Sequence, residues 1–127
     1  MPIGRENEKI MGEVYPKMTL SINATEGRIR IGQGVARALG FPEYICFYIS
    51  KNNDGLLVRP SEKKEFLSIK VGRNRNNPAK DDLRVYSLSF VTGLYEQNGW
   101  ELRKTYQIIG KYIQEWNAVF FSYVDAV

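Results

Sequence analysis

Residues 27–41 read GRIRIGQGVARALGF, a stretch that contains the signals for a strand followed by a short helix. Its first part alternates isoleucine with arginine, which is the pattern of a strand with one buried face. Two glycines then break the strand, and the apolar spacing from Val35 to Leu39 predicts a helix of about two turns that ends at Gly40. An alternating segment at residues 18–22, followed by a turn-rich segment, predicts another strand before it.

The residues after this stretch predict a β-hairpin. Residues 44–50 are rich in aromatic and β-branched side chains, and residues 52–55 read NNDG, a strong signal for a hairpin turn. Leu56 to Arg59 supply the return strand, which we expect Pro60 to end. The first unit is therefore predicted to have the order β-β-α-β-β.

The second half of the chain repeats this order with different side chains. We assign the first unit to residues 17–60 and the second to residues 65–124, with two unrelated α+β patterns as the alternative. The second unit is predicted to contain strands near 67–69 and 83–85, a helix from Leu88 to Tyr95 that Asn98-Gly99 ends, and a hairpin formed by 106–116 and 119–123. A long loop, residues 72–82, replaces the short turn of the first unit.

Residues 18–60 resemble the AbrB/MazE/SpoVT-like swapped-hairpin family of DNA-binding proteins. The matching residues are Gly27, Arg28, Ile29, Ile31, Arg37, Leu39 and Gly40. The sequence departs from the family pattern at Gly32, where proline is usual, and at Ala36, which replaces a frequent arginine. The second unit matches the family by pattern only.

The resemblance implies a fold. In this family two small β-β-α-β-β units exchange hairpins, because one unit alone cannot bury its apolar faces. We therefore expect a mostly β protein with two short helices, in which tandem repeats form one intertwined swapped-hairpin barrel, a single-chain pseudo-dimer. Residues 17–124 would form this single domain, and residues 1–16, which lack periodicity, are predicted to be a flexible N-terminal arm.

Basic residues fall into two groups that could bind DNA. The formal net charge is +4, and arginine can both neutralise phosphates and contact guanine edges. The resemblance implies contacts from the first group, and the loop of the second unit carries the other; the candidates are Arg28, Arg30, Arg37, Lys70, Arg73, Arg75 and Lys80. The alternative is that the arginines mark the solvated face of a half-buried strand and that the loop is merely soluble and disordered.

Two functions are compatible with this sequence. The first is a DNA-binding protein that resembles AbrB-like transcriptional regulators or antitoxins and binds double-stranded DNA through one basic face. The alternative is a protein-protein interaction module on the same barrel, with no DNA binding, which uses the aromatic hairpin around Trp116 as its contact surface. The chain would be a monomeric pseudo-dimer or a homodimer.

Composition argues against several other classes. The chain of 127 residues contains no histidine, which excludes histidine-based general acid/base catalysis, Ser-His and Cys-His pairs and nearly every common zinc site. Cys46 is the only cysteine, so no disulfide can form within the chain. We expect no enzyme, no cofactor and no metal site, and the absence of a signal-like or membrane-spanning segment favours a cytoplasmic protein without a membrane partner.

Overall fold

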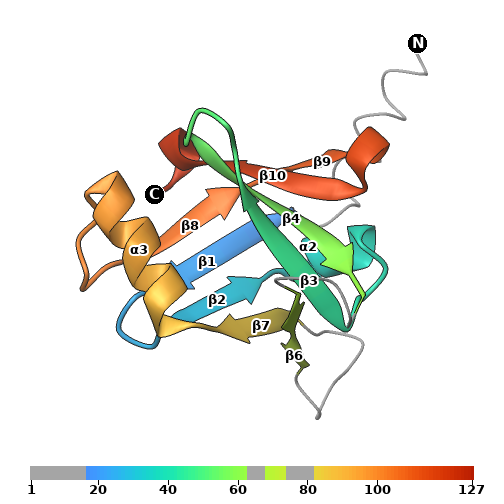
Figure 1. Ribbon diagram of the computed structural model, residues 1–127, viewed down its shortest axis with the longest axis horizontal. Helices are drawn as coiled ribbons and strands as arrows, with labels where there is room; N and C mark the ends of the chain where they lie inside the picture. Colours follow the sequence, from blue (N-terminus) through green and yellow to red (C-terminus); the bar gives the residue numbers. More distant parts are fainter. Residues whose placement is uncertain (1–16, 63–67, 74–81) are drawn as a thin grey trace.

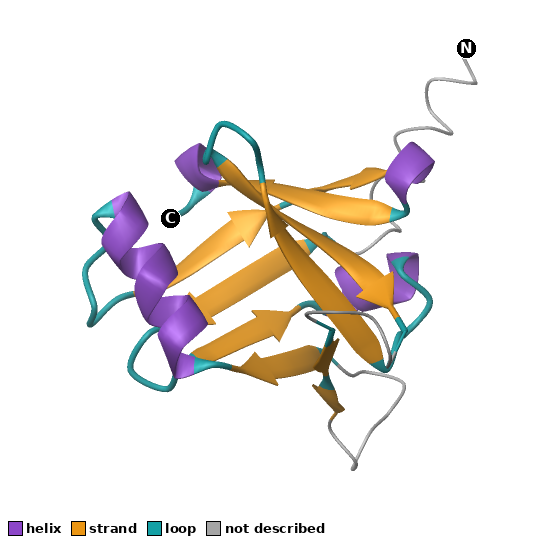
Figure 2. Ribbon diagram, in the orientation of Figure 1, coloured by secondary structure: helices purple, strands orange, loops and turns teal. Residues whose placement is uncertain are grey.

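The computed structural model describes residues 17–62, 68–73 and 82–127. Within these ranges the protein is rich in β-structure and contains two α-helices and two antiparallel sheets (Figures 1 and 2). The predicted mostly-β class with two helices is therefore confirmed. The predicted arm, residues 1–16, lies outside the described residues.

Sheet A has five strands in the order β6-β7-β2-β1-β8. Its strands are β6 (Gly72–Arg73), β7 (Leu83–Tyr86), β2 (Arg28–Ile31), β1 (Thr19–Asn23) and β8 (Thr105–Ile109). Strand β2 of the first half of the sequence pairs with β7 of the second half, so sheet A joins the two halves. In this pairing Arg30 lies opposite Arg84.

Sheet B also has five strands, in the order β5-β3-β4-β10-β9. Its strands are β5 (Ile69–Lys70), β3 (Tyr44–Ile49), β4 (Gly55–Ser61), β10 (Ala118–Ser122) and β9 (Lys111–Ile113). The prediction that Pro60 ends its strand is wrong, since β4 continues through Pro60, which pairs with Ile45. Pairing with β10 ends at Val58, so one side of β4 is an edge at Pro60, and proline is tolerated on an edge.

Two short connections carry the chain directly from one sheet to the other. Val71 separates β5 from β6, and Gly110 separates β8 from β9. The long strand expected over residues 106–116 is therefore two strands followed by the 3₁₀ helix η2 (Gln114–Trp116). The physical reason lies at Gly110, where a Cβ atom would come within 2.5 Å of the Phe121 ring, so only glycine permits this close approach.

The two α-helices lie at opposite ends of the sheets (Figure 1). Helix α2 (Gln33–Ala38) ends as predicted before Gly40, whose φ is +80°. Helix α3 (Leu88–Asn98) ends at Gly99, which is left-handed, as a C-terminal glycine stop requires. The 3₁₀ helix η3 (Tyr123–Asp125) follows β10. No helix in the described ranges has the length and apolarity needed to cross a membrane.

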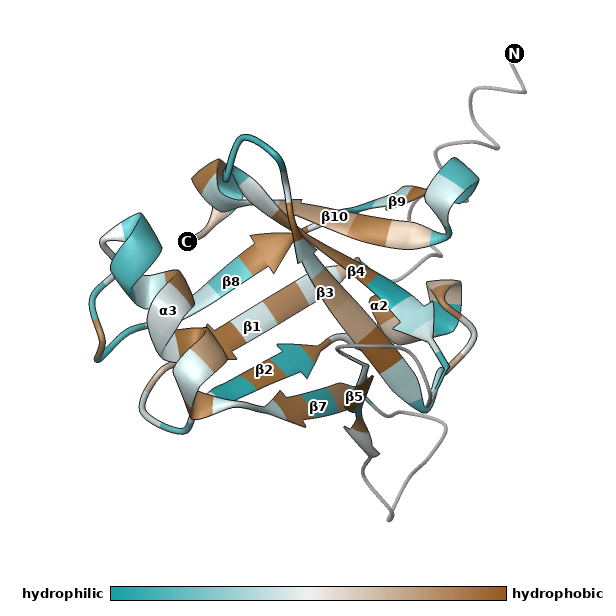
Figure 3. Cartoon of the chain, in the orientation of Figure 1, coloured by the Kyte–Doolittle hydropathy of each residue, from teal (hydrophilic) through white to brown (hydrophobic). Residues whose placement is uncertain are grey.

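The core lies between the inward faces of the two sheets. Figure 3 shows the alternation of apolar and polar residues along β1 and β2 that creates these faces. The strand residues in the core are Leu20, Ile22, Ile29, Ile31, Leu83, Val85 and Ile108 from sheet A and Ile45, Leu56, Val58, Val119 and Phe121 from sheet B. Their exposed fraction is 0 to 1%, so burial of these side chains is the main stabilising contribution.

Tyr95 of α3 closes one end of the core with a buried phenol. Its hydroxyl donates to the backbone carbonyl of Ile22, 2.9 Å away, and also contacts the carbonyl of Lys104. Burial raises the pKa of the Tyr95 phenol, which keeps the hydroxyl protonated as a donor. The same ring makes edge contacts with Trp100 and Tyr106, so this helix is held by both polar and aromatic contacts.

Removal of this hydroxyl should destabilise the protein. Tyr95→Phe is expected to lower the free energy of unfolding by about 1–2 kcal/mol, because the hydroxyl's buried hydrogen bond to the Ile22 carbonyl is lost. Chemical denaturation measures the change. Tyr86→Phe is the control, since Tyr86 is 63% exposed and a surface change there should stay within about 0.5 kcal/mol. Equal effects of the two variants would contradict this role of Tyr95.

Candidate nucleic-acid interface

The outer face of sheet A is polar and carries three arginines. The strand register places Gly72, Arg84, Arg30, Ser21 and Gln107 in one row across all five strands. The adjacent row holds Tyr86, Arg28, Asn23 and Thr105 across four of them. Because alternate residues of a strand share a face, these side chains form one surface, which we call the arginine face.

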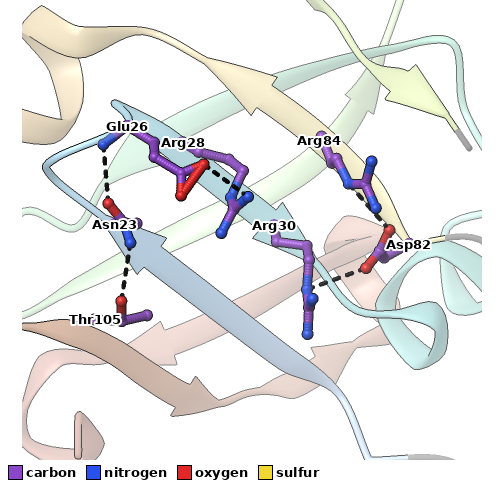
Figure 4. A network of polar contacts seen from close by, with 7 residues as sticks. All are labelled: Asn23, Glu26, Arg28, Arg30, Asp82, Arg84 and Thr105. Carbon is purple, nitrogen blue, oxygen red and sulfur yellow. Dashed lines mark hydrogen bonds and ion pairs between the residues drawn. The ribbon is translucent and has the colours of Figure 1, made fainter.

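At the centre of the arginine face, two guanidinium groups share one carboxylate. Nε of Arg30 lies 3.0 Å from Oδ2 of Asp82, and Nε of Arg84 lies 3.5 Å from Oδ1 (Figure 4). The side chains of Arg30 and Arg84 are 47% and 36% exposed. The Arg84 Nε is itself buried and makes no hydrogen bond, so its contact with Asp82 is an ion pair only. One carboxylate leaves this pair of cations with a net positive charge.

A second polar group orders the neighbouring row of the arginine face. Arg28 pairs with Glu26 at 3.0 Å. Asn23 accepts a hydrogen bond from the Glu26 backbone N–H through its Oδ1 and donates from Nδ2 to the Thr105 hydroxyl, at 2.9 and 3.0 Å (Figure 4). These contacts fix the turn between β1 and β2, so Arg28 is held beside Arg30 and Arg84.

The structure brings together only part of the predicted basic face. Arg28 and Arg30 lie on the arginine face. The other candidates lie elsewhere or are not described: Arg37 is exposed on α2, Lys70 is exposed on β5 in sheet B, Arg73 lies in β6, and Arg75 and Lys80 fall outside the described residues. The loop of residues 72–82 therefore contributes no described basic side chain to this face, and the side chain that it does contribute is the carboxylate of Asp82.

Arg84 and Asp82 belong to the candidate site but were not predicted from the sequence. The sequence does indicate that Arg84 lies on the exposed face of a strand, because Leu83 and Val85 alternate around it. Ile29 and Ile31 alternate around Arg30 in the same way. What the sequence could not show is the pairing of β2 with β7, which places the two arginines opposite each other. Asp82 immediately precedes β7 and reaches both.

The arginine face offers many hydrogen-bond donors and a small positive charge. Three guanidinium groups face two carboxylates, those of Glu26 and Asp82. Each guanidinium carries five N–H donors, and the ion pairs occupy only some of them. Hydroxyl and amide side chains surround the arginines in both rows. Arginine with Ser, Thr, Asn, Gln and Tyr is the set of side chains that contacts phosphate and sugar oxygens in protein–DNA complexes.

No protein-family model matches the chain. Searches of curated proteins and of solved structures find no match either. In this geometry the arginine face offers guanidinium N–H donors and a small net positive charge to anionic groups.

Proposed function

We propose that the protein binds double-stranded DNA through the arginine face, as a transcriptional regulator or antitoxin-like protein that resembles the AbrB-like family. The observation that carries this proposal is the Arg30–Arg84 cross-strand pair with its single carboxylate. Like charges directly opposite each other destabilise a sheet. Asp82 offsets one of the two positive charges, and a phosphate group bound by the exposed guanidinium N–H groups would offset the other.

We also propose that the two halves are tandem copies of one unit. The pairing of β2 with β7 supports this. Arg30 lies opposite Arg84, Ile29 lies opposite Val85, and Ile31 lies opposite Leu83. A two-fold axis that passes between Arg30 and Arg84 would produce this register.

Interlocking of the two copies is supported by the other pairings between the halves. β1 pairs with β8, β3 with β5 and β4 with β10. The two crossings at Val71 and Gly110 are compatible with one swapped-hairpin barrel built from both copies. A pseudo-dimer of this kind would match the approximate two-fold symmetry of a palindromic duplex.

A titration of a mixed-sequence duplex tests the proposed function. Fluorescence anisotropy of the labelled duplex with the full chain should show micromolar binding at about 50 mM salt. If each arginine of the arginine face contacts one phosphate, affinity should fall about 40-fold between about 50 and 200 mM salt. Absence of binding at the lower salt concentration would overturn the proposal.

Removal of the carboxylate that Arg30 and Arg84 share should strengthen DNA binding. Asp82→Asn is expected to tighten duplex binding about threefold, since it removes a negative charge roughly 6 Å from the bound phosphate in a solvated site. Glu115→Gln, which makes the same change in charge beside sheet B, should leave the affinity unchanged. Anisotropy at low salt measures both. If the two variants behave alike, the duplex does not contact the arginine pair.

A further inference from the structure

The outer face of sheet B carries an exposed apolar groove. Tyr48, Leu57, Ile113, Trp116 and Phe120 line a hollow of about 410 Å³, and we call this the aromatic groove. Tyr48 is 45% exposed and Trp116 is 59% exposed. A second hollow of about 380 Å³ is also lined by Tyr48, Leu57 and Trp116, so the two hollows are adjacent.

The groove is built by three adjacent strands and a neighbouring 3₁₀ helix. In the register of sheet B, Tyr48 lies opposite Leu57 and Leu57 lies opposite Phe120. Leu57 and Phe120 alternate with core residues, so they point away from the core, and Tyr48 shares their face because it lies opposite Leu57. Trp116 belongs to η2, which stands at the end of the same face. Sheet A exposes polar residues in the equivalent position, and exposed apolar clusters of this kind mark interaction sites.

Unpaired cations surround the aromatic groove. Lys51 and Arg59 line it, and Lys111 is exposed opposite Phe120. None of these three side chains forms an ion pair with another described residue, although Glu115 lies in the same lining. A ligand that fits this groove therefore needs apolar anchors and negative charge together.

We propose that the aromatic groove docks an acidic segment of a partner protein, with aromatic or leucine side chains as anchors and carboxylates facing Arg59 and Lys51. A second copy of this chain fits poorly, because it would bring two cationic rims together and the chain has a formal net charge of +4. A single-stranded nucleic acid is disfavoured by the aliphatic floor of Leu57 and Ile113, since base binding relies on flat aromatic and polar contacts. The proposal concerns sheet B and does not depend on DNA binding by sheet A.

Peptide selection tests the proposal. A phage-displayed library of random dodecapeptides is selected on the immobilised full chain, and enriched peptides are synthesised with a fluorescent label. We expect enriched sequences that combine carboxylates with aromatic or leucine residues. Arg59→Glu and Trp116→Ala should each weaken binding of these peptides about tenfold.

The controls separate docking from loss of structure. Arg103→Glu makes the same reversal of charge at an exposed position outside the aromatic groove and should bind the peptides like the parent chain. Thermal melting confirms that each variant is folded. The proposal is overturned if no acidic apolar peptide is enriched or if enriched peptides bind the Trp116→Ala variant unchanged. It is also overturned if the groove residues instead mediate dimerisation in sedimentation or bind a labelled thymidine oligonucleotide more tightly than the peptides.

Discussion

Replacing Arg30 and Arg84 together with alanine is expected to weaken duplex binding about 100-fold at low salt. Each charged hydrogen bond to a phosphate contributes about 1.5 kcal/mol or more, so two lost contacts correspond to about two powers of ten. The slope of log affinity against log salt concentration should also fall by about two. Anisotropy titrations over several salt concentrations measure both quantities.

The matched control removes two exposed cations from the other sheet. Arg59→Ala combined with Lys111→Ala makes the same change in net charge on the outer face of sheet B and should alter duplex affinity only a few-fold through the long-range field. If both double variants lose affinity equally, DNA binding follows net charge alone and the arginine pair has no special role.

Gly110→Ala is expected to lower the free energy of unfolding by about 3 kcal/mol. An added Cβ would stand 2.5 Å from the Phe121 ring and 2.8 Å from Cγ1 of Val119. Phe121 and Val119 are fully buried core residues, so neither can move away without disturbing the packing between the sheets. The melting temperature should fall by roughly 10 °C. Thermal and chemical denaturation measure the effect.

Gly93→Ala is the control for this substitution. Gly93 lies inside α3, is exposed, and has no atom within 4 Å of an added Cβ. Alanine stabilises helix interiors relative to glycine, so this variant should gain about 0.5–1 kcal/mol. If Gly110→Ala lowers the free energy of unfolding and Gly93→Ala raises it, the loss of stability arises at the crossing between the sheets. An unchanged free energy of unfolding for Gly110→Ala would contradict the tight packing there.

Local signals in the sequence were sufficient to predict the elements of the first half. The glycine stop of α2, the strand pattern around Arg30 and the turn at residues 52–55 each depend on neighbours in sequence. The break at Gly110 could not be predicted, because it depends on the approach of Phe121 from another strand. Continuation of β4 through Pro60 likewise depends on which strands flank it.

The candidate site was predicted only where it is local. Arg28 and Arg30 alternate on one strand, so their common face follows from the sequence. The opposition of Arg30 and Arg84 depends on strand pairing between residues far apart in the chain. The same long-range pairing places Lys70 in sheet B, so it cannot join the arginine face as the charge distribution suggested.

A chemical-shift titration locates the surface of the protein that binds DNA. The ¹⁵N-labelled full chain is titrated with a mixed-sequence duplex, and amide and arginine side-chain resonances are followed. If DNA binds the arginine face, the largest shifts will fall on β2, β7 and β1, with the Arg28, Arg30 and Arg84 guanidinium signals among them. Shifts confined to sheet B or α2, or no shifts at a duplex excess at low salt, would contradict DNA binding through this face.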